Sequence, residues 1–260
     1  MKTDTDTDSD PSPRGTVLVT GGSRGIGAAT ALRCAKDGFA VAINYTRASA
    51  AADTLVQRIR ADGGQALALQ ADVSDEAQVL AMFARIDAEL PPLSGLVNNA
   101  GIVDVSARVD AIDMARLQRI FAINVFGSFL CAREALRRMS TRHGGRGGAI
   151  VNLSSMAATL GSPGVYVDYA ASKGAIDTFT VGLAREVAAE GVRVNAVRPG
   201  IIDTDIHASG GDPQRAAELG RQQPMQRAGT ADEVAQAVAW LLSHAASYTT
   251  GAILDVAGGR

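Results

Sequence analysis

Two side chains capable of proton transfer stand four residues apart in the sequence. Tyr169 and Lys173 lie in an alanine-rich stretch of helical character, and residues four apart on a helix share one face. A phenol beside an ammonium group could donate a proton to a ligand oxygen or accept one from it. A free tyrosine has a pKa of about 10, so a shift to neutrality requires about 4 kcal/mol of phenolate stabilisation. We predict that Lys173 supplies part of this stabilisation.

Further polar side chains could complete a site around this pair. Ser154 and Ser155 follow a short apolar run, and a serine hydroxyl can donate a hydrogen bond to an oxygen that gains negative charge. Successive strand residues point to opposite faces, so only one of the two serines should enter a site. Asn124 interrupts an apolar helical stretch, where a polar amide requires a partner.

A glycine-rich segment near the start of the chain leads from a β-branched run directly into a helical pattern. Its spacing is G-x-x-x-G-x-G rather than G-x-G-x-x-G. Glycines permit positive φ and let the backbone approach a pyrophosphate at a helix N-terminus. The segment predicts a dinucleotide site, with a tight structural turn as the alternative. The candidate contacts are Gly21, Ser23, Arg24, Gly25, Ile26 and Gly27.

The end of the second predicted strand indicates which dinucleotide binds. An NAD-selective site places a carboxylate there to hold the ribose 2′-hydroxyl. Here the strand ends in Tyr45, Thr46 and Arg47, without an acid. Arg24 and Arg47 could both reach a 2′-phosphate, because a guanidinium binds phosphate through paired hydrogen bonds. We predict NADP(H) in preference to NAD(H), the alternative being that both arginines are solvated surface residues.

The elements that position these residues follow from the alternation of short β-branched runs with longer stretches of helical period. This pattern is typical of an α/β fold with a doubly wound parallel sheet and helices on both faces. Seven strands are predicted, at residues 17–20, 40–44, 66–70, 95–98, 149–153, 193–197 and 252–255. Six helices are predicted, at residues 26–36, 48–61, 76–89, 111–139, 170–189 and 231–243. The polar motifs then lie along the edge where parallel strands end, and residues 200–229 are predicted to form a flap.

Composition restricts the class of protein. With 47% hydrophobic residues among 260, we predict one domain over residues 15–260 after a disordered tail over residues 1–14. A formal charge of −2 gives no basic excess for a nucleic-acid partner. No run approaches the roughly 20 apolar residues of a membrane span, and no signal peptide is visible. Cys34 and Cys131 are expected to be reduced and buried, which suits a soluble, cytoplasmic protein. No metal site is predicted.

Seven motifs, in their order along the chain, resemble the short-chain dehydrogenase/reductase family in its single-domain branch. The resemblance covers residues 15–259, and the order of the motifs makes it specific although each motif alone is weak. The motifs are the glycine turn, Asp72-Val73, Asn98-Asn99-Ala100-Gly101, Asn124, Ser154-Ser155, Tyr169-Ala170-Ala171-Ser172-Lys173 and Pro199-Gly200. Residues 161–168 depart from many members in being slightly longer.

This resemblance implies a Rossmann-like homodimer or homotetramer that moves a hydride between a nicotinamide and a carbonyl or alcohol carbon. It implies that Tyr169 is the acid or base, aided by Lys173 and the charge of oxidised nicotinamide. It implies that Ser155 rather than Ser154 contacts the substrate oxygen, and that Asn124 reaches Lys173 through water. The implied cofactor contacts are Asp72, Val73, Asn99, Ala100, Gly101, Tyr169, Lys173, Pro199, Gly200, Ile202 and Thr204.

Three functions remain open at this point. The first is an NADPH-dependent carbonyl reductase of small or medium substrates, equivalent in reverse to an alcohol or sugar dehydrogenase. The second is a 3-oxoacyl-thioester reductase, whose acidic carrier could dock on a basic cluster; helix-dipole effects alone would also explain that cluster. The third is a cofactor-binding regulator, which the intact catalytic residues argue against. The cluster consists of Arg137, Arg138, Arg142 and Arg146. Substrate contacts are expected at residues 156–167 and 201–226.

Overall fold

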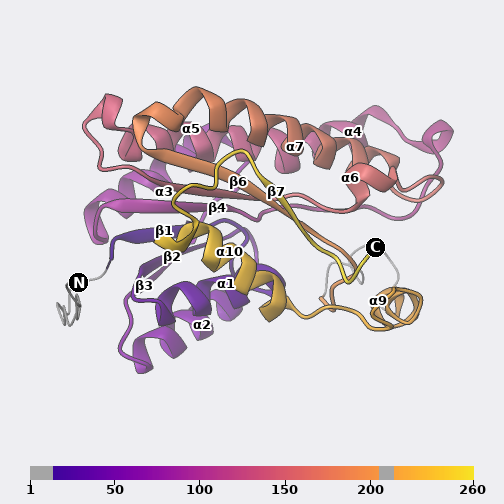
Figure 1. Cartoon of the computed structure of the whole chain (residues 1–260), viewed down its shortest axis with the longest axis horizontal. Coiled ribbons are helices and arrows are strands. Elements are labelled where there is room, and N and C mark those ends of the chain that lie inside the picture. The colour runs from indigo at the N-terminus through magenta and orange to yellow at the C-terminus, as the bar shows by residue number, and fades with distance from the viewer. Residues whose placement is uncertain (1–13, 205–213) are drawn as a thin grey trace, which may run out of the picture.

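The computed structural model describes residues 14–204 and 214–260, and its strands form one sheet (Figure 1). All seven strands pair in parallel, in the order β3-β2-β1-β4-β5-β6-β7. The predicted fold class is therefore confirmed, and the sheet is Rossmann-like. The strands are β1 (Thr16–Val19), β2 (Ala40–Tyr45), β3 (Ala66–Gln70), β4 (Leu93–Asn98), β5 (Gly148–Leu153), β6 (Val192–Pro199) and β7 (Ile253–Val256). Of the predicted tail, residues 1–13 lie outside the described residues.

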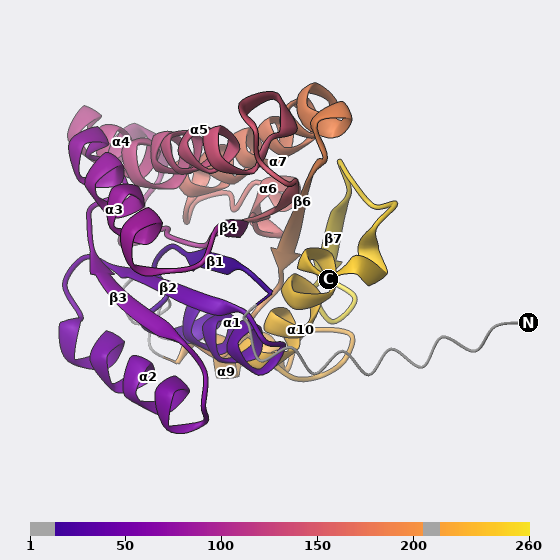
Figure 2. The same ribbon diagram turned by 90° about the vertical axis from the view of Figure 1, so that its left-hand side faces the viewer.

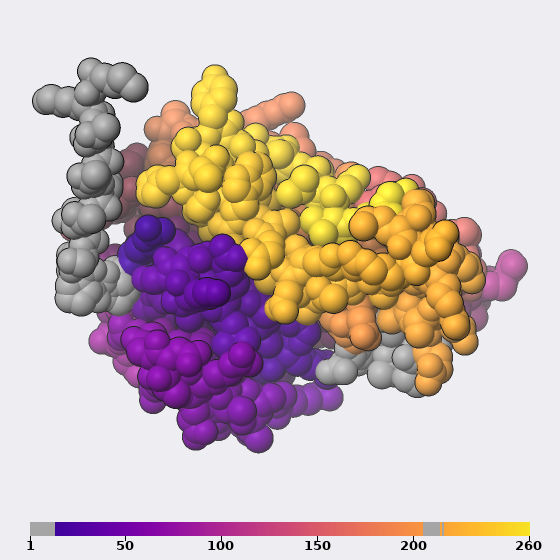
Figure 3. Space-filling model, turned by 60° about the horizontal axis from the view of Figure 1, so that its bottom comes forward, coloured from indigo at the N-terminus to yellow at the C-terminus, as the bar shows by residue number. Residues whose placement is uncertain are grey.

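Helices cover both faces of the sheet (Figures 1 and 2). One face carries α1 (Gly25–Lys36), α2 (Ser49–Ala61) and α10 (Ala231–Leu242), and α1 packs against α10 although they lie at opposite ends of the chain. The space-filling view shows this face, with the indigo and violet N-terminal segments lying against the yellow C-terminal ones (Figure 3). The other face carries α3 (Glu76–Glu89), α5 (Gly127–Met139) and α7 (Val167–Val187).

Apolar side chains on both faces of the central strands bury the middle of the sheet. Val17 and Val19 of β1 belong to the core beneath α1 and α10, whereas Leu18 points into the core beneath α3, α5 and α7. This explains why the strands read as continuous apolar runs rather than alternating ones. Cys34 lies in the first core and Cys131 in the second; both are free and buried, and burial raises the pKa of each thiol to about 12.

The predicted helix over residues 111–139 begins only at Met114, and it changes from α to π geometry and back before it ends at Met139. A 3₁₀ turn at Val109–Ala111 precedes α4 (Met114–Phe121), whose N-terminus is capped by the Asp113 carboxylate. A π-helical segment, Ala122–Phe126, then joins α4 to α5. Asn124 lies inside this widened turn, and π segments are frequent at functional sites. The helical period in the sequence predicts one apolar face but not a local change from α to π.

Two short helices were also not predicted, because a single turn carries too little periodicity. The helix α6 (Ala157–Leu160) follows β5, and α9 (Arg215–Gly220) lies in the stretch predicted to be a flap. Residues 205–213 of that stretch lie outside the described residues. No helix in the described parts of the chain is long and apolar enough to cross a membrane.

The order in which successive strands join the sheet reverses between β1 and β4, and this determines where a ligand fits. The strand β1 has β2 on one side and β4 on the other, so the crossovers after β1 and after β3 diverge. In open parallel sheets, the carboxyl ends of the strands at such a switch point form the binding crevice. The candidate residues that follow β1, β4, β5 and β6 meet at this edge, and those after β2 and β3 lie further along it.

Candidate active site

The helix α7 carries the two proton-transfer residues on one face, as the four-residue spacing predicts. Both Tyr169 and Lys173 line a pocket at the switch-point edge. The Lys173 Nζ lies 5.6 Å from the centroid of the Tyr169 ring. It donates a hydrogen bond of 2.7 Å to the Leu153 carbonyl at the end of β5. This bond fixes the ammonium group at the base of the pocket.

The two adjacent serines face different surroundings. Ser155 lines the pocket, and its side chain hydrogen-bonds with the Tyr169 hydroxyl. Its Oγ also accepts a hydrogen bond from the Ala157 amide at 3.1 Å. Ser154 is buried and donates to the Lys173 carbonyl at 3.3 Å, so it braces α7 against β5. The structure therefore places Ser155, rather than Ser154, beside the phenol.

Burial determines the pKa of both members of the pair. It raises the pKa of Tyr169 above its usual value, and the hydrogen bond with Ser155 opposes this shift in part. It lowers the pKa of Lys173 to about 8, with the Asp177 carboxylate opposing. Lys173 is not among the causes of this shift, and its stabilisation of the phenolate together with oxidised nicotinamide stays a prediction. Desolvation disfavours the phenolate, and the ammonium group is held on the Leu153 carbonyl.

Asn124 reaches the site from the π segment and is fully satisfied by neighbouring groups. Its Oδ1 accepts from the Ile102 amide at 2.8 Å, and its Nδ2 donates to the Ile102 carbonyl at 3.0 Å and to Ser172 Oγ at 3.1 Å. A Cβ built on Gly101 would lie 3.5 Å from both Asn124 Oδ1 and Lys173 Nζ. Asn124 and Lys173 thus converge on the Gly101 backbone. A water link between them stays a prediction.

The glycine-rich turn has the backbone shape expected of a phosphate cradle. Gly21 and Gly25 adopt φ of 59° and 53°, which favours glycine. A Cβ on Gly27 would lie 2.5 Å from the Gly21 carbonyl oxygen, so the turn and the first turn of α1 pack too closely for any side chain. The amides at the start of α1 therefore remain open to an anion, and the turn fits a dinucleotide pyrophosphate.

Two side chains from other strands hold this turn. The Asn99 amide donates to the carbonyls of Thr20 and Gly21 at 2.8 and 2.9 Å, so it braces the turn rather than projecting freely. Asn44, which the sequence reasoning missed, accepts from the Gly21 amide at 3.1 Å and donates to the Ala71 carbonyl at 2.9 Å. A polar residue in the otherwise apolar run at residues 40–45 is the signal that could have identified it.

The pocket brings together nearly half of the predicted site, from residues that follow β1, β4, β5 and β6. Its lining includes Ile26, Asn99, Gly101, Ser155, Tyr169, Lys173, Pro199, Gly200, Ile202 and Thr204. Apolar side chains complete the wall around Tyr169, among them Val103, Met156, Leu160 and Ile201. Gly25 also approaches it, because a Cβ there would lie 3.4 Å from the Thr204 side chain. An apolar wall around a few convergent polar groups is typical of a small-molecule site.

The remaining predicted residues lie outside the pocket lining. Arg24 precedes α1 and Arg47 follows β2, and both are exposed; Tyr45 is half-buried and Thr46 exposed beside Arg47. Asp72 binds Ser74 in a turn after β3, and Val73 is buried against Gly127 of α5. Gly21, Ser23, Gly27, Ala100 and Asn124 are also absent from the lining. In residues 14–204 and 214–260, no group of three or more potential ligands is arranged to hold a metal.

Comparison with known proteins places this site in a family. Residues 21–260 match a family described as Enoyl-(Acyl carrier protein) reductase. The chain is 58% identical over 243 residues to the uncharacterized oxidoreductase YgfF of Escherichia coli (strain K12), covering 94% of this chain and 98% of that protein. It is 37% identical over 247 residues to the 3-oxoacyl-[acyl-carrier-protein] reductase FabG of Staphylococcus aureus (strain Mu50), covering 94% and 97%.

A solved structure of similar shape is a short chain dehydrogenase from Burkholderia cenocepacia J2315 in complex with NADP. Its TM-score is 0.85 at 36% identity, and the match covers 94% of this chain and 96% of that one. These matches span nearly the whole chain, at identities well above those that indicate a shared fold alone. The chain therefore belongs to the short-chain dehydrogenase/reductase family of oxidoreductases.

Proposed function

We propose that this oxidoreductase transfers a hydride between NADP(H) and a carbonyl or secondary alcohol of small or medium size, with Tyr169 as the general acid or base. The observation that carries the proposal is the Tyr169 hydroxyl, hydrogen-bonded with Ser155 in an apolar pocket that also contains Lys173. The pocket adjoins the glycine turn, so a bound dinucleotide and a substrate oxygen could meet at the phenol.

The chain's own residues divide the work of proton transfer. Bound NADPH would supply the hydride. Tyr169 then donates its proton to the substrate oxygen, which suits a phenol whose pKa is raised by burial. Ser155 donates a hydrogen bond to the same oxygen as negative charge develops there. Lys173 holds a positive charge near the phenol, and Asn124 fixes the backbone of Ile102 beside Gly101.

The preference for NADP(H) rests on two exposed arginines beside the turn. Within the described residues, neither Arg24 nor Arg47 forms an ion pair. Arg33 of α1, by contrast, pairs with Asp37. Both guanidinium groups are therefore free for a 2′-phosphate. The end of β2 carries no carboxylate that would hold a 2′-hydroxyl. The Burkholderia relative solved with NADP supports the same assignment.

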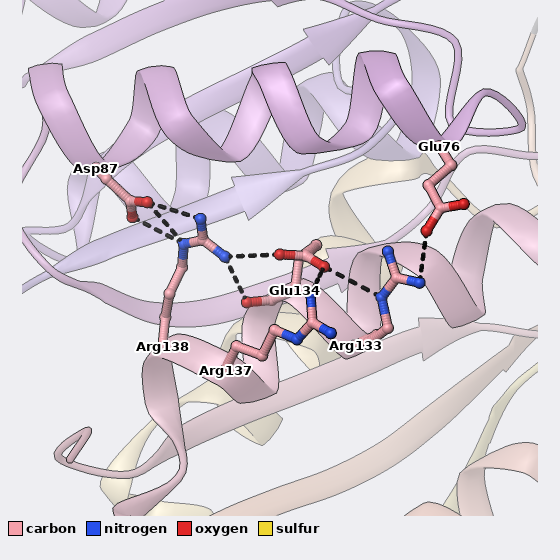
Figure 4. Close-up of polar contacts among 6 residues, drawn as sticks. All are labelled: Glu76, Asp87, Arg133, Glu134, Arg137 and Arg138. Atoms are coloured by element: carbon pink, nitrogen blue, oxygen red, sulfur yellow. Dashed lines mark hydrogen bonds and ion pairs between the residues drawn. The ribbon is translucent and has the colours of Figure 1, made fainter. Parts of the chain in front are cut away.

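The second candidate, reduction of acyl groups on an acidic carrier, gains little from the structure. The Arg137 and Arg138 guanidinium groups lie 2.8 and 3.1 Å from the buried Glu134 carboxylate, and Arg138 also lies 2.7 Å from Asp87 (Figure 4). Arg142 faces a further carboxylate at 3.9 Å. The proposed docking cluster is thus largely neutralised within the chain. The pairing of its charges indicates a structural role, in which ion pairs join α3 to α5.

We also propose a homodimer or homotetramer that uses α5 and α7. Phe126 of the π segment and Phe129 of α5 are 58% and 48% exposed, and Phe129 stacks on Phe179 of α7 with centroids 3.8 Å apart. A contiguous exposed aromatic patch is typical of an interaction surface. Sedimentation at micromolar concentration should give a dimer or tetramer, and a monomer would contradict the proposal.

The function is tested by a panel of ketones, oxo-sugars and 3-oxoacyl thioesters, each followed by NADPH absorbance. We expect turnover of at least one apolar ketone, with thioesters no better when presented on a carrier protein than on a small thiol. A clear advantage of the carrier-bound thioester would favour the second candidate. Tight NADPH binding without turnover of any compound would favour a regulator.

A further inference from the structure

A buried ion pair lies directly beside Tyr169 and takes no part in the chemistry described above. Arg116 of α4 donates from Nε and Nη2 to the two carboxylate oxygens of Asp168, at 2.6 and 3.0 Å. Arg116 is 7% and Asp168 4% exposed. Asp168 immediately precedes Tyr169 in the first turn of α7. A planar guanidinium in this two-point contact fixes the position and the orientation of that turn.

The same guanidinium also holds the loop that follows β4. Its Nη1 donates to the Val105 carbonyl at 2.6 Å. Within this loop, residues 102–108, Val103 lines the pocket, and Gly101 just before it does so as well. Arg116 therefore connects the loop on one side of the pocket to the helix that carries Tyr169.

Other contacts show that this loop is held by α4 and its continuation rather than by the sheet. Asn124 bonds both backbone groups of Ile102, and Arg119 of α4 pairs with Asp104. The Ala107 amide donates to the Val165 carbonyl at 3.0 Å, which ties the loop to the segment ahead of α7. That segment is part of residues 161–168, and it contributes Ser162 and Tyr166 to the pocket lining.

An ion pair in such surroundings requires an explanation other than stability. Removing two charges from water costs free energy that their attraction often fails to recover, and apolar pairs of similar volume are frequently as stable. The pair's geometry is specific, because three donors of one side chain reach two separate segments that both border the pocket. Lysine could keep the charge but not this planar, three-donor arrangement.

We propose that Arg116 is a positioning residue for substrate binding: by tying residues 102–108 to the first turn of α7 through Asp168, it sets the distance between Val103 and Tyr169. The proposal rests on the proposed function in placing the substrate between these two residues. It makes Arg116 a determinant of how large a carbonyl compound the pocket accepts. Arg116 acts through the backbone of its neighbours and does not touch the reacting atoms.

The test uses the full-length enzyme and four variants: Arg116→Met, Arg116→Lys, the double variant Arg116→Met/Asp168→Leu, and Arg138→Met as a control. Arg138 also bridges two carboxylates, Asp87 of α3 and Glu134 of α5 (Figure 4), and none of these three residues lines the pocket. The double variant removes both charges of the pair, so it should fold even if Arg116→Met alone does not. The readouts are KM and kcat for one ketone, the Kd for NADPH by fluorescence, and hydrogen exchange of the Ala107 amide.

In the double variant we expect KM for the ketone to rise about tenfold or more, because a displacement of about 1 Å in a positioning element can cost up to about 10²-fold. The Kd for NADPH should change less than about twofold, because the glycine turn is untouched. Exchange of the Ala107 amide should accelerate about tenfold or more as the loop is released. Arg116→Lys should raise KM less than Arg116→Met does. Arg138→Met should leave KM, the Kd for NADPH and the exchange of the Ala107 amide unchanged.

A purely structural pair gives a different result. If the double variant restores the wild-type melting temperature together with wild-type KM and Ala107 protection, the proposal is overturned. If the wild type reduces no carbonyl compound, the proposed function fails. Hydrogen exchange then still decides the inference, since normal Ala107 protection in the double variant would overturn it without any substrate.

Discussion

Replacing Arg24 and Arg47 together by alanine should remove most of the preference for NADPH. A hydrogen bond to a charged group contributes about 1.5–3 kcal/mol. Both side chains are exposed, so each contact with a 2′-phosphate belongs at the lower end of that range. About 1.5 kcal/mol each corresponds to roughly tenfold per arginine and up to about 100-fold for the pair. NADH lacks the phosphate, so its kcat/KM should change little.

The assay is steady-state kinetics with both cofactors on one good ketone. We expect the wild type to prefer NADPH at least about tenfold in kcat/KM, and the double variant to lose most of this ratio. The ratio should also fall in high salt, because exposed charges are screened. Arg58→Ala removes the same charge from an exposed position of α2 and should change neither value. Equal or better use of NADH by the wild type would reject the reasoning and leave the Tyr169 mechanism untouched.

Two further predictions follow from the site. Burial raises the pKa of Tyr169, so the rate of alcohol oxidation, which needs the phenolate, should increase as the pH rises above neutrality. The rate of carbonyl reduction should instead decrease above about pH 8, where Lys173 loses its charge. Opposite slopes in initial rates against pH test this, and parallel slopes would contradict it. Asn44→Ala should lower the free energy of unfolding by about 2–3 kcal/mol, because three buried hydrogen bonds are lost, and should weaken NADPH binding. Urea unfolding checks it against Thr30→Val, which removes a buried hydroxyl without a partner and should cost little.

The sheet and the polar edge could be predicted because their signals are local. Each strand is a short apolar run between turn residues, and every predicted strand lies within two residues of the observed one. The positive φ angles of Gly21 and Gly25 agree with the expectation from residue type, because glycine adopts such angles without steric cost. The four-residue spacing of Tyr169 and Lys173 places them on one face whatever surrounds the helix.

The features that were missed depend on partners distant in the sequence. Asn124 was itself predicted, but its position in a π segment and its bonds to the backbone of Ile102, 22 residues earlier, were not, because no helical period shows them. Arg116 and Asp168 are 52 residues apart, and each alone reads as a surface charge on a helix. The raised pKa of Tyr169 reflects desolvation, which the spacing to a lysine does not reveal. Only the folded chain brings these groups together.

The central claim is that Tyr169 transfers the proton, and Tyr169→Phe tests it most directly. The substitution removes only the hydroxyl, which the structure places in hydrogen-bonding contact with Ser155. Single-turnover reduction of a ketone by bound NADPH should slow by at least about 10²-fold, the usual contribution of general acid catalysis. The Kd for NADPH, measured by fluorescence on the same sample, should stay close to that of the wild type. A variant that binds NADPH normally and keeps more than about half of the wild-type rate would contradict the account.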